Sequence, residues 1–187
     1  MTNILRPYDL QLLIAASHIM VSSSAARVIV YGVAELLIFL FPLTLYLLWR
    51  MPETRGRHHA ARKAVIIALM ASIMAIAFKT AISVVYLRPR PFVSHPDLLY
   101  FHFGIDPQSF PSGHAMVAFA IAASLYLSGF RKVGGWLLVF AFLISIGRVF
   151  AGVHYPTDVL GGAIIGSGIA LYLHREASTL RKYLPNS

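Results

Sequence analysis

An arginine, a histidine and an aspartate stand close together between two apolar runs near the carboxyl end of the chain. Five residues separate Arg148 from His154, and three separate His154 from Asp158. Pro156 favours the first turn of a helix, where its missing N–H would be unpaired anyway, so Asp158 can reach back to the imidazole. An aspartate that accepts the Nδ1 proton leaves Nε2 free as a base or nucleophile, and the guanidinium of Arg148 fits phosphoryl oxygens. The spacing predicts a base or nucleophile at His154 beside an arginine suited to phosphoryl oxygens; the alternative is a polar loop at a membrane surface.

A second candidate phosphate site is the run Arg88-Pro89-Arg90-Pro91, which ends a long apolar segment. Its alternating prolines stop a helix and stiffen the chain. Two arginines on such a turn can hold a phosphate from fixed directions. The alternative is that they only anchor the end of the helix at the membrane interface.

A third polar run, residues 109–114, precedes another apolar segment and reads Ser-Phe-Pro-Ser-Gly-His. The first N–H groups of a helix that begins near Ser112 are unpaired and lie at the positive end of the helix dipole, which favours an anion. Gly113 lets the backbone approach that anion closely. His114 can donate a proton to a leaving oxygen, and a histidine entering a lipid-facing helix is costly without such a task. Ordinary capping of the helix by Ser112 is the alternative for this serine.

The composition is that of a membrane protein. Of the 187 residues, 58% are hydrophobic and 12% charged, and the mean hydropathy is +0.71. We therefore expect one polytopic membrane domain over residues 1–187, with no cleavable signal peptide. The lack of cysteine excludes a disulfide framework, a thiol nucleophile and a cysteine-ligated metal. The net charge of +9 does not indicate nucleic-acid binding, because most Lys and Arg residues lie in short clusters between apolar runs.

These apolar runs must position the three polar motifs. We expect an all-α bundle with five spanning helices, at residues 25–49, 64–87, 113–127, 135–151 and 156–173. Residues 9–21 are apolar but too short to span comfortably, so they predict an interfacial helix, with a sixth span as the alternative. Residues 92–111 predict a polar loop. If the basic cluster at 50–63 is cytoplasmic, all three motifs fall on the opposite face of the membrane.

Together the three motifs resemble those of the type 2 phosphatidic acid phosphatase superfamily. That family has a lysine-containing motif ending in Arg-Pro, then Pro-Ser-Gly-His, then Ser-Arg, His and Asp at the spacing found here. The second motif is complete at residues 111–114, and the third lacks only its serine, which is replaced by Gly147. In the first motif Arg90 aligns with the family arginine, so Ser83 stands where the lysine is expected. Lys79 lies one helical turn deeper on nearly the same face.

The resemblance implies phosphoryl transfer in two steps without a metal or other cofactor. His154 would attack the phosphorus, Asp158 would orient the imidazole, and His114 would protonate the departing lipid phosphate. The same resemblance implies a set of residues that bind the phosphate: Arg90, Arg148, Ser112 and Gly113, with Arg88 and Lys79 as secondary candidates. The implied partners are a polyprenyl or glycerophospholipid phosphate as substrate and the surrounding membrane lipid.

Within this superfamily, the missing motif lysine and the run His-Tyr-Pro-x-Asp-x-x-Gly-Gly resemble undecaprenyl-diphosphatases of the bacitracin-resistance type. Members of that branch often have Asp at the position of Gly113. The branch implies hydrolysis of undecaprenyl diphosphate in the bacterial plasma membrane, with the site facing the periplasm or cell exterior. Alternatives are a broad-specificity phosphatase for phosphatidic acid or phosphatidylglycerol phosphate, a sugar-phosphate phosphatase, a haloperoxidase and a non-enzymatic membrane protein.

Two further ionisable residues, Glu35 and Lys79, lie within predicted spans at matching depths. Such residues are expensive in lipid and usually face a partner or a wet cavity. We expect a buried ion pair between them. The alternatives are that Lys79 reaches the phosphate while Glu35 lines a cavity, or that the two residues are unrelated.

Overall fold

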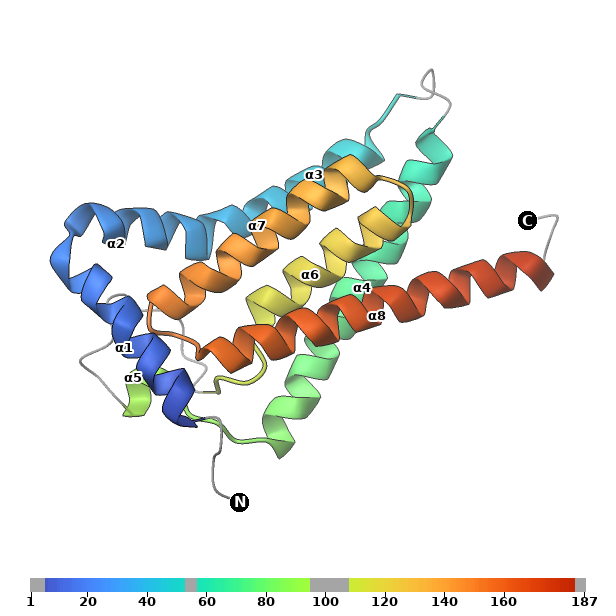
Figure 1. Ribbon diagram of the computed structural model, residues 1–187. Coiled ribbons are helices and arrows are strands. Elements are labelled where there is room, and N and C mark those ends of the chain that lie inside the picture. Colours follow the sequence, from blue (N-terminus) through green and yellow to red (C-terminus); the bar gives the residue numbers. More distant parts are fainter. Residues whose placement is uncertain (1–5, 53–56, 95–107, 184–187) are drawn as a thin grey trace.

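The computed structural model describes residues 6–52, 57–94 and 108–183, and these residues confirm the all-α prediction (Figure 1). The helical elements are α1 (Arg6–Ser22), α2 (Ser24–Tyr31), η1 (Gly32–Leu36), η2 (Leu37–Phe39), α3 (Leu40–Trp49), α4 (His58–Val85), α5 (Pro91–Ser94), α6 (Gly113–Leu127), α7 (Arg131–Phe150) and α8 (Pro156–Tyr183). Part of the predicted polar loop, residues 95–107, lies outside the described residues.

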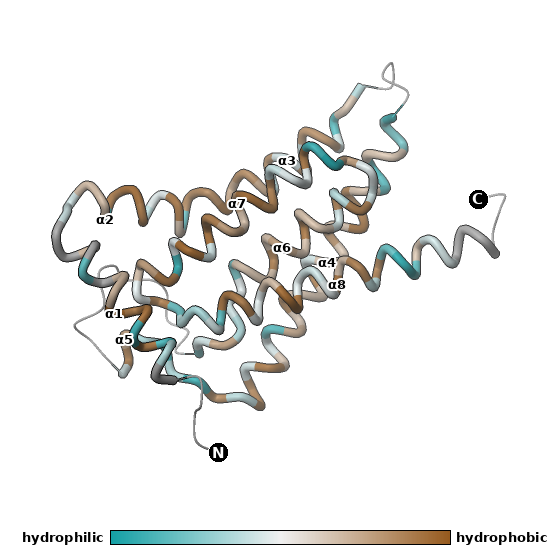
Figure 2. The backbone as a smooth tube through the Cα atoms, in the orientation of Figure 1, coloured by the Kyte–Doolittle hydropathy of each residue, from teal (hydrophilic) through white to brown (hydrophobic). Residues whose placement is uncertain are grey.

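Within the described residues, four helices are long and apolar enough to cross a membrane: Ser24–Trp49, His58–Val85, Arg131–Phe150 and Pro156–Thr179. The shorter apolar helix α6 corresponds to the remaining predicted span. Apolar residues run along these helices, and hydrophilic residues gather near their ends (Figure 2). Several helices continue past the predicted limits, since α4 already begins at His58 and α8 continues to Tyr183. The basic residues in these extensions are good helix formers, so hydrogen bonding continues outside the apolar segment.

Helix α6 is the centre of the bundle and packs against α4, α7 and α8. The contact with α8 is close because α8 carries glycine where the two helices cross. A Cβ on Gly162 would lie 2.7 Å from the carbonyl oxygen of Ser112, and one on Gly166 would overlap the carbonyl oxygen of Met116. Small residues four apart allow helix backbones to approach in this way. The approach brings the start of α6 beside the start of α8.

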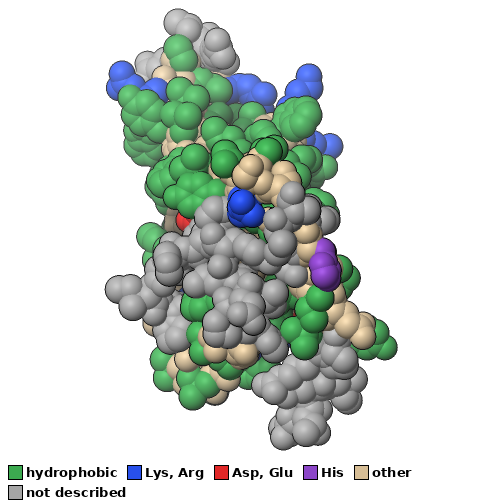
Figure 3. Space-filling view, turned by 90° about the vertical axis from the view of Figure 1, so that its left-hand side faces the viewer, with side chains coloured by type: hydrophobic (Ala, Val, Ile, Leu, Met, Phe, Trp, Pro, Cys, Tyr) green, Lys and Arg blue, Asp and Glu red, His purple; other side chains and the backbone are tan. Residues whose placement is uncertain are grey.

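The two ends of the bundle differ in charge. Arg50, Arg62 and Lys63 lie where α3 ends and α4 begins, and Arg131 begins α7 at the same end. Figure 3 shows Lys and Arg side chains gathered towards this end of the molecule. At the other end α1 lies across the junction of α7 and α8 (Figure 1). The three motifs meet at this second end.

Candidate active site

The turn that carries the first motif is fastened to the segment that carries the second. The backbone N–H of Arg88 donates to the side-chain oxygen of Gln108 (3.1 Å), and its carbonyl accepts from the N–H of Ser109 (2.8 Å). The Arg90 Nε atom donates to the Gln108 carbonyl at 3.2 Å. Prolines at 89 and 91 hold this turn extended. These contacts hold the first motif beside the second.

The third motif is shaped by the end of α7 and the start of α8. Gly152 adopts a φ of +73°, a left-handed conformation that glycine enters without steric cost, and the chain turns there towards α8. Pro156 is the first residue of α8, as predicted. The Asp158 carboxylate reaches back to accept from the N–H of Tyr155 at 2.8 Å, which satisfies one of the unpaired donors at the helix start. This contact fixes the carboxylate beside His154.

The relation between His154 and Asp158 differs from the prediction. The Nδ1 atom of His154 is 3.8 Å from Oδ2 of Asp158, too far for a hydrogen bond. The hydroxyl of Ser109 lies beside both groups: it donates to the same carboxylate oxygen and is 3.4 Å from Nδ1. All three side chains are buried. Ser109 is thus a bridging residue that the sequence prediction did not include, although it belongs to the motif segment at residues 109–114.

Arg88 lies behind the aspartate, and its role as a secondary phosphate ligand stays a prediction. Its guanidinium donates to Asp158 (2.5 Å), to Thr157 (2.7 Å) and to Asp9 of α1 (2.6 Å). It also stacks over the ring of Tyr155, 4.2 Å from the ring centroid. These partners engage three of the five N–H donors of the guanidinium.

Asp9 is the second residue that sequence reasoning missed. Its carboxylate is 2% exposed and accepts from Arg88, from the Thr157 hydroxyl at 2.6 Å and from the Thr157 N–H at 3.1 Å. The N-terminal helix is therefore tied to the start of α8. The available sequence signal was an acidic residue in an apolar segment, but its partners lie 79 and 148 positions away.

The electrostatic environment keeps His154 neutral. Its burial, together with the positive charges of Arg148 and Arg90, lowers the pKa of His154 to about 4, although Asp158 acts in the opposite direction. Burial also acts to lower the pKa of Arg88, but the carboxylates of Asp158 and Asp9 raise it above the ordinary value. At neutral pH the site therefore combines an unprotonated imidazole with charged guanidinium groups.

Arg148, near the end of α7, faces Glu35 of η1 from the other side of the site. The Arg148 side chain is 3% exposed and forms an ion pair with Glu35. The same carboxylate is 3.9 Å from Nε2 of His114. The predicted pair between Glu35 and Lys79 is therefore wrong, because Arg148 lies nearer to Glu35 than sequence depth alone indicated.

The start of α6 carries the polar groups expected of an anion site. Ser112 is fully buried, its N–H donates to the Asp158 carbonyl at 3.1 Å, and its hydroxyl makes no hydrogen bond with another described residue. The serine is the N-cap residue by position but does not cap α6 with its side chain. A Cβ on Gly113 would meet only Lys79, at 3.9 Å, so packing does not require glycine there. The Ser112 hydroxyl is thus a hydrogen-bonding group at the start of α6 that a ligand can use.

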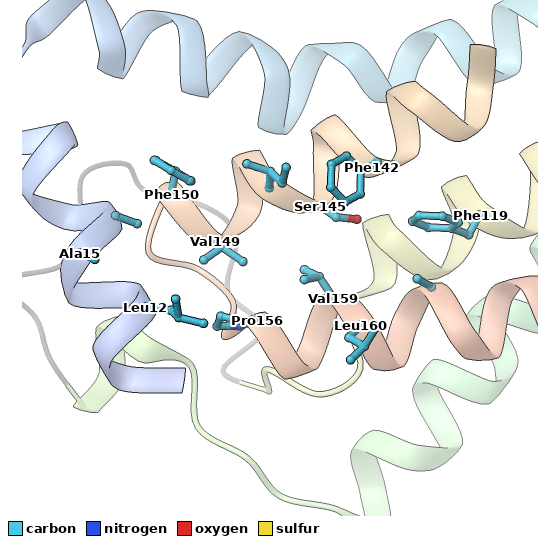
Figure 4. A pocket seen from close by; sticks show the side chains of 13 residues that line it. Leu12, Ala15, Phe119, Phe142, Ser145, Val149, Phe150, Pro156, Val159 and Leu160 are labelled. Carbon is cyan, nitrogen blue, oxygen red and sulfur yellow. The ribbon is translucent and has the colours of Figure 1, made fainter. Parts of the chain in front are cut away.

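Two pockets of different character lie near these residues. One of about 250 Å³ is lined by His114, Gly113 and Lys79 together with apolar side chains from η2, α4 and α6. A larger one of about 500 Å³ lies between α1, α7 and α8, and its lining is apolar except for Ser145 (Figure 4). The Ser145 hydroxyl donates to the carbonyl of Ala141. Only the smaller pocket includes candidate catalytic residues.

The predicted residues thus come from distant segments to one end of the bundle. His154, Asp158, Ser112 and Arg88 are joined through the contacts above, and the charges of Arg90 and Arg148 act on His154. His114 and Lys79 border the smaller pocket on the opposite side of the site.

A neutral buried histidine among fixed guanidinium groups, set in a bundle of apolar helices, is the arrangement of a membrane-embedded phosphatase. Residues 64–182 match the model of the PAP2 superfamily, and the chain belongs to that superfamily.

The most similar relatives include two Bacillus proteins. The chain is 32% identical over 152 residues to the undecaprenyl-diphosphatase BcrC of Bacillus subtilis, covering 81% of this chain and 75% of the relative. It is 34% identical over 154 residues to a bacitracin transport permease protein BcrC of Bacillus licheniformis, covering 81% and 72%. Among solved structures, the chain resembles a transmembrane PAP2-type phosphatidylglycerolphosphate phosphatase of Bacillus subtilis. That match has a TM-score of 0.69 and 27% identity and covers 95% of this chain and 88% of that one.

Proposed function

We propose that this protein is a lipid diphosphatase that hydrolyses undecaprenyl diphosphate to undecaprenyl phosphate and inorganic phosphate. The observation that carries the proposal is the buried, neutral His154 with Ser109 and Asp158 on one side and the charges of Arg148 and Arg90 acting on it. The similarity to an undecaprenyl-diphosphatase supports the choice of substrate.

In the proposed first step, Nε2 of His154 attacks the terminal phosphorus. A P–N bond forms while the bond from phosphorus to the bridging oxygen breaks. His114 gives its proton to that oxygen, so undecaprenyl phosphate leaves. Ser109 and Asp158 hold the imidazole through its Nδ1 side, which directs Nε2 to the substrate.

In the second step, water attacks the phosphorus of the phosphohistidine. His114 takes the proton of the water, the P–N bond breaks, and phosphate and neutral His154 are released. Arg148, Arg90 and the groups at the start of α6 hold the equatorial oxygens, where charge develops in the transition state. Lys79 lies close enough to Gly113 to contribute from α4.

A substrate panel tests this function. Purified protein in detergent with EDTA is given undecaprenyl diphosphate, phosphatidic acid, phosphatidylglycerol phosphate or a soluble phosphomonoester, and phosphate release is measured. We expect the highest kcat/KM with undecaprenyl diphosphate and turnover that resists EDTA. A preference for phosphatidylglycerol phosphate would support the second candidate function, which the similarity to the solved phosphatase favours. No phosphate release from any substrate would contradict both.

We also propose that the protein resides in a bacterial plasma membrane with the site facing the periplasm or cell exterior. The basic end of the bundle, at Arg50, Arg62 and Arg131, supports this orientation because cytoplasmic ends are enriched in Lys and Arg. Single cysteines at Ser94 and Ser128 in the cysteine-free chain test it. A membrane-impermeant thiol reagent should label position 94 in intact cells and spare position 128, and the reverse pattern would overturn the orientation.

A further inference from the structure

Glu35 is a carboxylate within the first long apolar helical segment, yet it belongs to neither the motifs nor the proposed mechanism. Its side chain is 25% exposed, forms an ion pair with the buried Arg148 and lies 3.9 Å from His114. An ionisable residue inside a membrane segment is costly and usually has a function. The position of Glu35 between a phosphate-binding candidate and the candidate acid points to a function in the reaction.

Two local features bring Glu35 to this position. The helix widens into a π-turn at η1, where the N–H of Leu37 donates to the carbonyl of Gly32. Such turns inside α-helices are frequent at functional sites. On the facing helix Gly147 leaves room for the backbone: a Cβ there would lie 3.1 Å from the N atom and 3.2 Å from the Cα atom of Ala34. The residue that replaces the family serine therefore permits η1 to pack directly on α7 beside Arg148.

The ion pair and the substrate make competing demands on Arg148. A carboxylate and a phosphate both present oxygen acceptors to the guanidinium fork, and both are negatively charged. With Glu35 in place, a phosphate cannot take the same donors of Arg148 and is repelled at short range. The contact with His114 gives the carboxylate a second positive partner when the imidazole is protonated.

We propose that Glu35 is a resident counter-anion of the phosphate site. Glu35 pairs with Arg148 in the substrate-free enzyme. When the substrate phosphate binds Arg148 in its place, Glu35 keeps only its contact with His114. The inference rests on the proposed phosphate-binding role of Arg148. Glu35 is a positioning residue in this account, since it acts through Arg148 and His114. The competition weakens the binding of phosphate and so favours release of the second product.

Glu35→Gln separates this role from a purely structural ion pair. The amide keeps the size of the side chain but removes the charge that competes with phosphate. If the carboxylate occupies Arg148 about nine-tenths of the time, its removal lowers the inhibition constant of inorganic phosphate about 10-fold. We expect a lower KM and tighter inhibition by phosphate, because the competing charge is removed from Arg148. We also expect a reduced kcat, because Arg148 is no longer positioned and product leaves more slowly. A structural role predicts weaker inhibition and a lower Tm instead.

Glu176→Gln is the matched control, because it removes the same charge from an exposed position near the end of α8. It should leave KM, kcat and phosphate inhibition unchanged. Gly147→Ala provides a second route if Glu35→Gln fails to fold, since the added Cβ pushes η1 away from Arg148 without changing a charge. It should also tighten phosphate inhibition.

The inference is overturned if phosphate inhibition is unchanged or weaker in the folded Glu35→Gln variant, or in Gly147→Ala where the first does not fold. A wild-type enzyme that is active but insensitive to inorganic phosphate would also overturn it. By contrast, absence of phosphate release from the wild-type protein would contradict the proposed function itself.

Discussion

The two histidines of the site lie in contrasting surroundings. His154 is 2% exposed, and its neighbours Ser109 and Asp158 are fully buried. His114 has a side chain that is 33% exposed, borders a pocket and has a carboxylate 3.9 Å away. The half of the site around His154 is a closed set of hydrogen bonds, and we call it the closed half. The half around His114 is open.

The two surroundings suit the different tasks of a nucleophile and an acid. A nucleophile must keep one tautomer and one direction, so a closed network with Ser109, Asp158, Arg88 and Asp9 is an advantage. An acid that serves a departing lipid phosphate must meet a bulky group that enters and leaves. The N-terminal helix supports the first half through Asp9, whereas η1 reaches the second through Glu35.

The largest effect is expected from His154→Asn. Removal of the nucleophile should lower kcat by about 10⁴-fold or more for every substrate, including one with a good leaving group. Phosphate release from detergent-purified protein measures this loss. Asparagine is preferable to alanine because His154 is buried, so alanine would leave a cavity. Near-normal turnover in a folded variant would remove His154 from the mechanism.

His114→Asn should give a smaller loss that depends on the leaving group. Proton transfer by a positioned side chain contributes about 10²- to 10⁴-fold, so kcat for undecaprenyl diphosphate should fall by that amount. The leaving group of p-nitrophenyl phosphate needs no proton. With this substrate, the burst phase that reports the first step should be nearly as fast in His114→Asn as in the wild-type protein. An equal loss with both substrates would mean that His114 is not the acid.

Arg88→Met tests the closed half through stability. The substitution leaves the buried carboxylates of Asp158 and Asp9 without their cation, and breaking a buried ion pair in this way costs about 3–5 kcal/mol. Denaturation in detergent measures the loss, with the exposed Arg175→Met as a control that should change little. A rise in KM without loss of stability would instead support Arg88 as a phosphate ligand.

The pH dependence of stability provides a smaller effect. The pKa of His154 is lowered to about 4 in the folded protein, whereas an unfolded histidine titrates near about 6.5. The unfolded chain therefore takes up a proton first as the pH falls, so the contribution of His154 is complete above about pH 6.5 and is lost towards pH 4. The loss is about 3 kcal/mol, and it should be absent in His154→Asn. Identical pH profiles for the two proteins would contradict a buried neutral imidazole.

Much of the fold followed from the sequence because long apolar runs separated by basic clusters are strong signals. The start of α8 at Pro156 was also predictable from local chemistry. The bridging position of Ser109 and the support from Asp9 were not, because they depend on contacts between distant segments. The partner of Glu35 was mispredicted for a related reason: depth in the membrane places a residue along a helix but does not say which neighbouring helix it faces. Only the packing of η1 on Gly147 decides that.

His154, in the closed half of the site, should carry the covalent phosphoryl group. To test this, the enzyme is mixed with substrate labelled in its terminal phosphate, the reaction is stopped rapidly without acid, and the label bound to the protein is measured. We expect a label on wild-type protein that is stable to alkali, labile to acid and located on His154. The label should be missing in His154→Asn and should form from p-nitrophenyl phosphate in His114→Asn. Label that persists in folded His154→Asn, or that maps to His114, would contradict a covalent intermediate on His154.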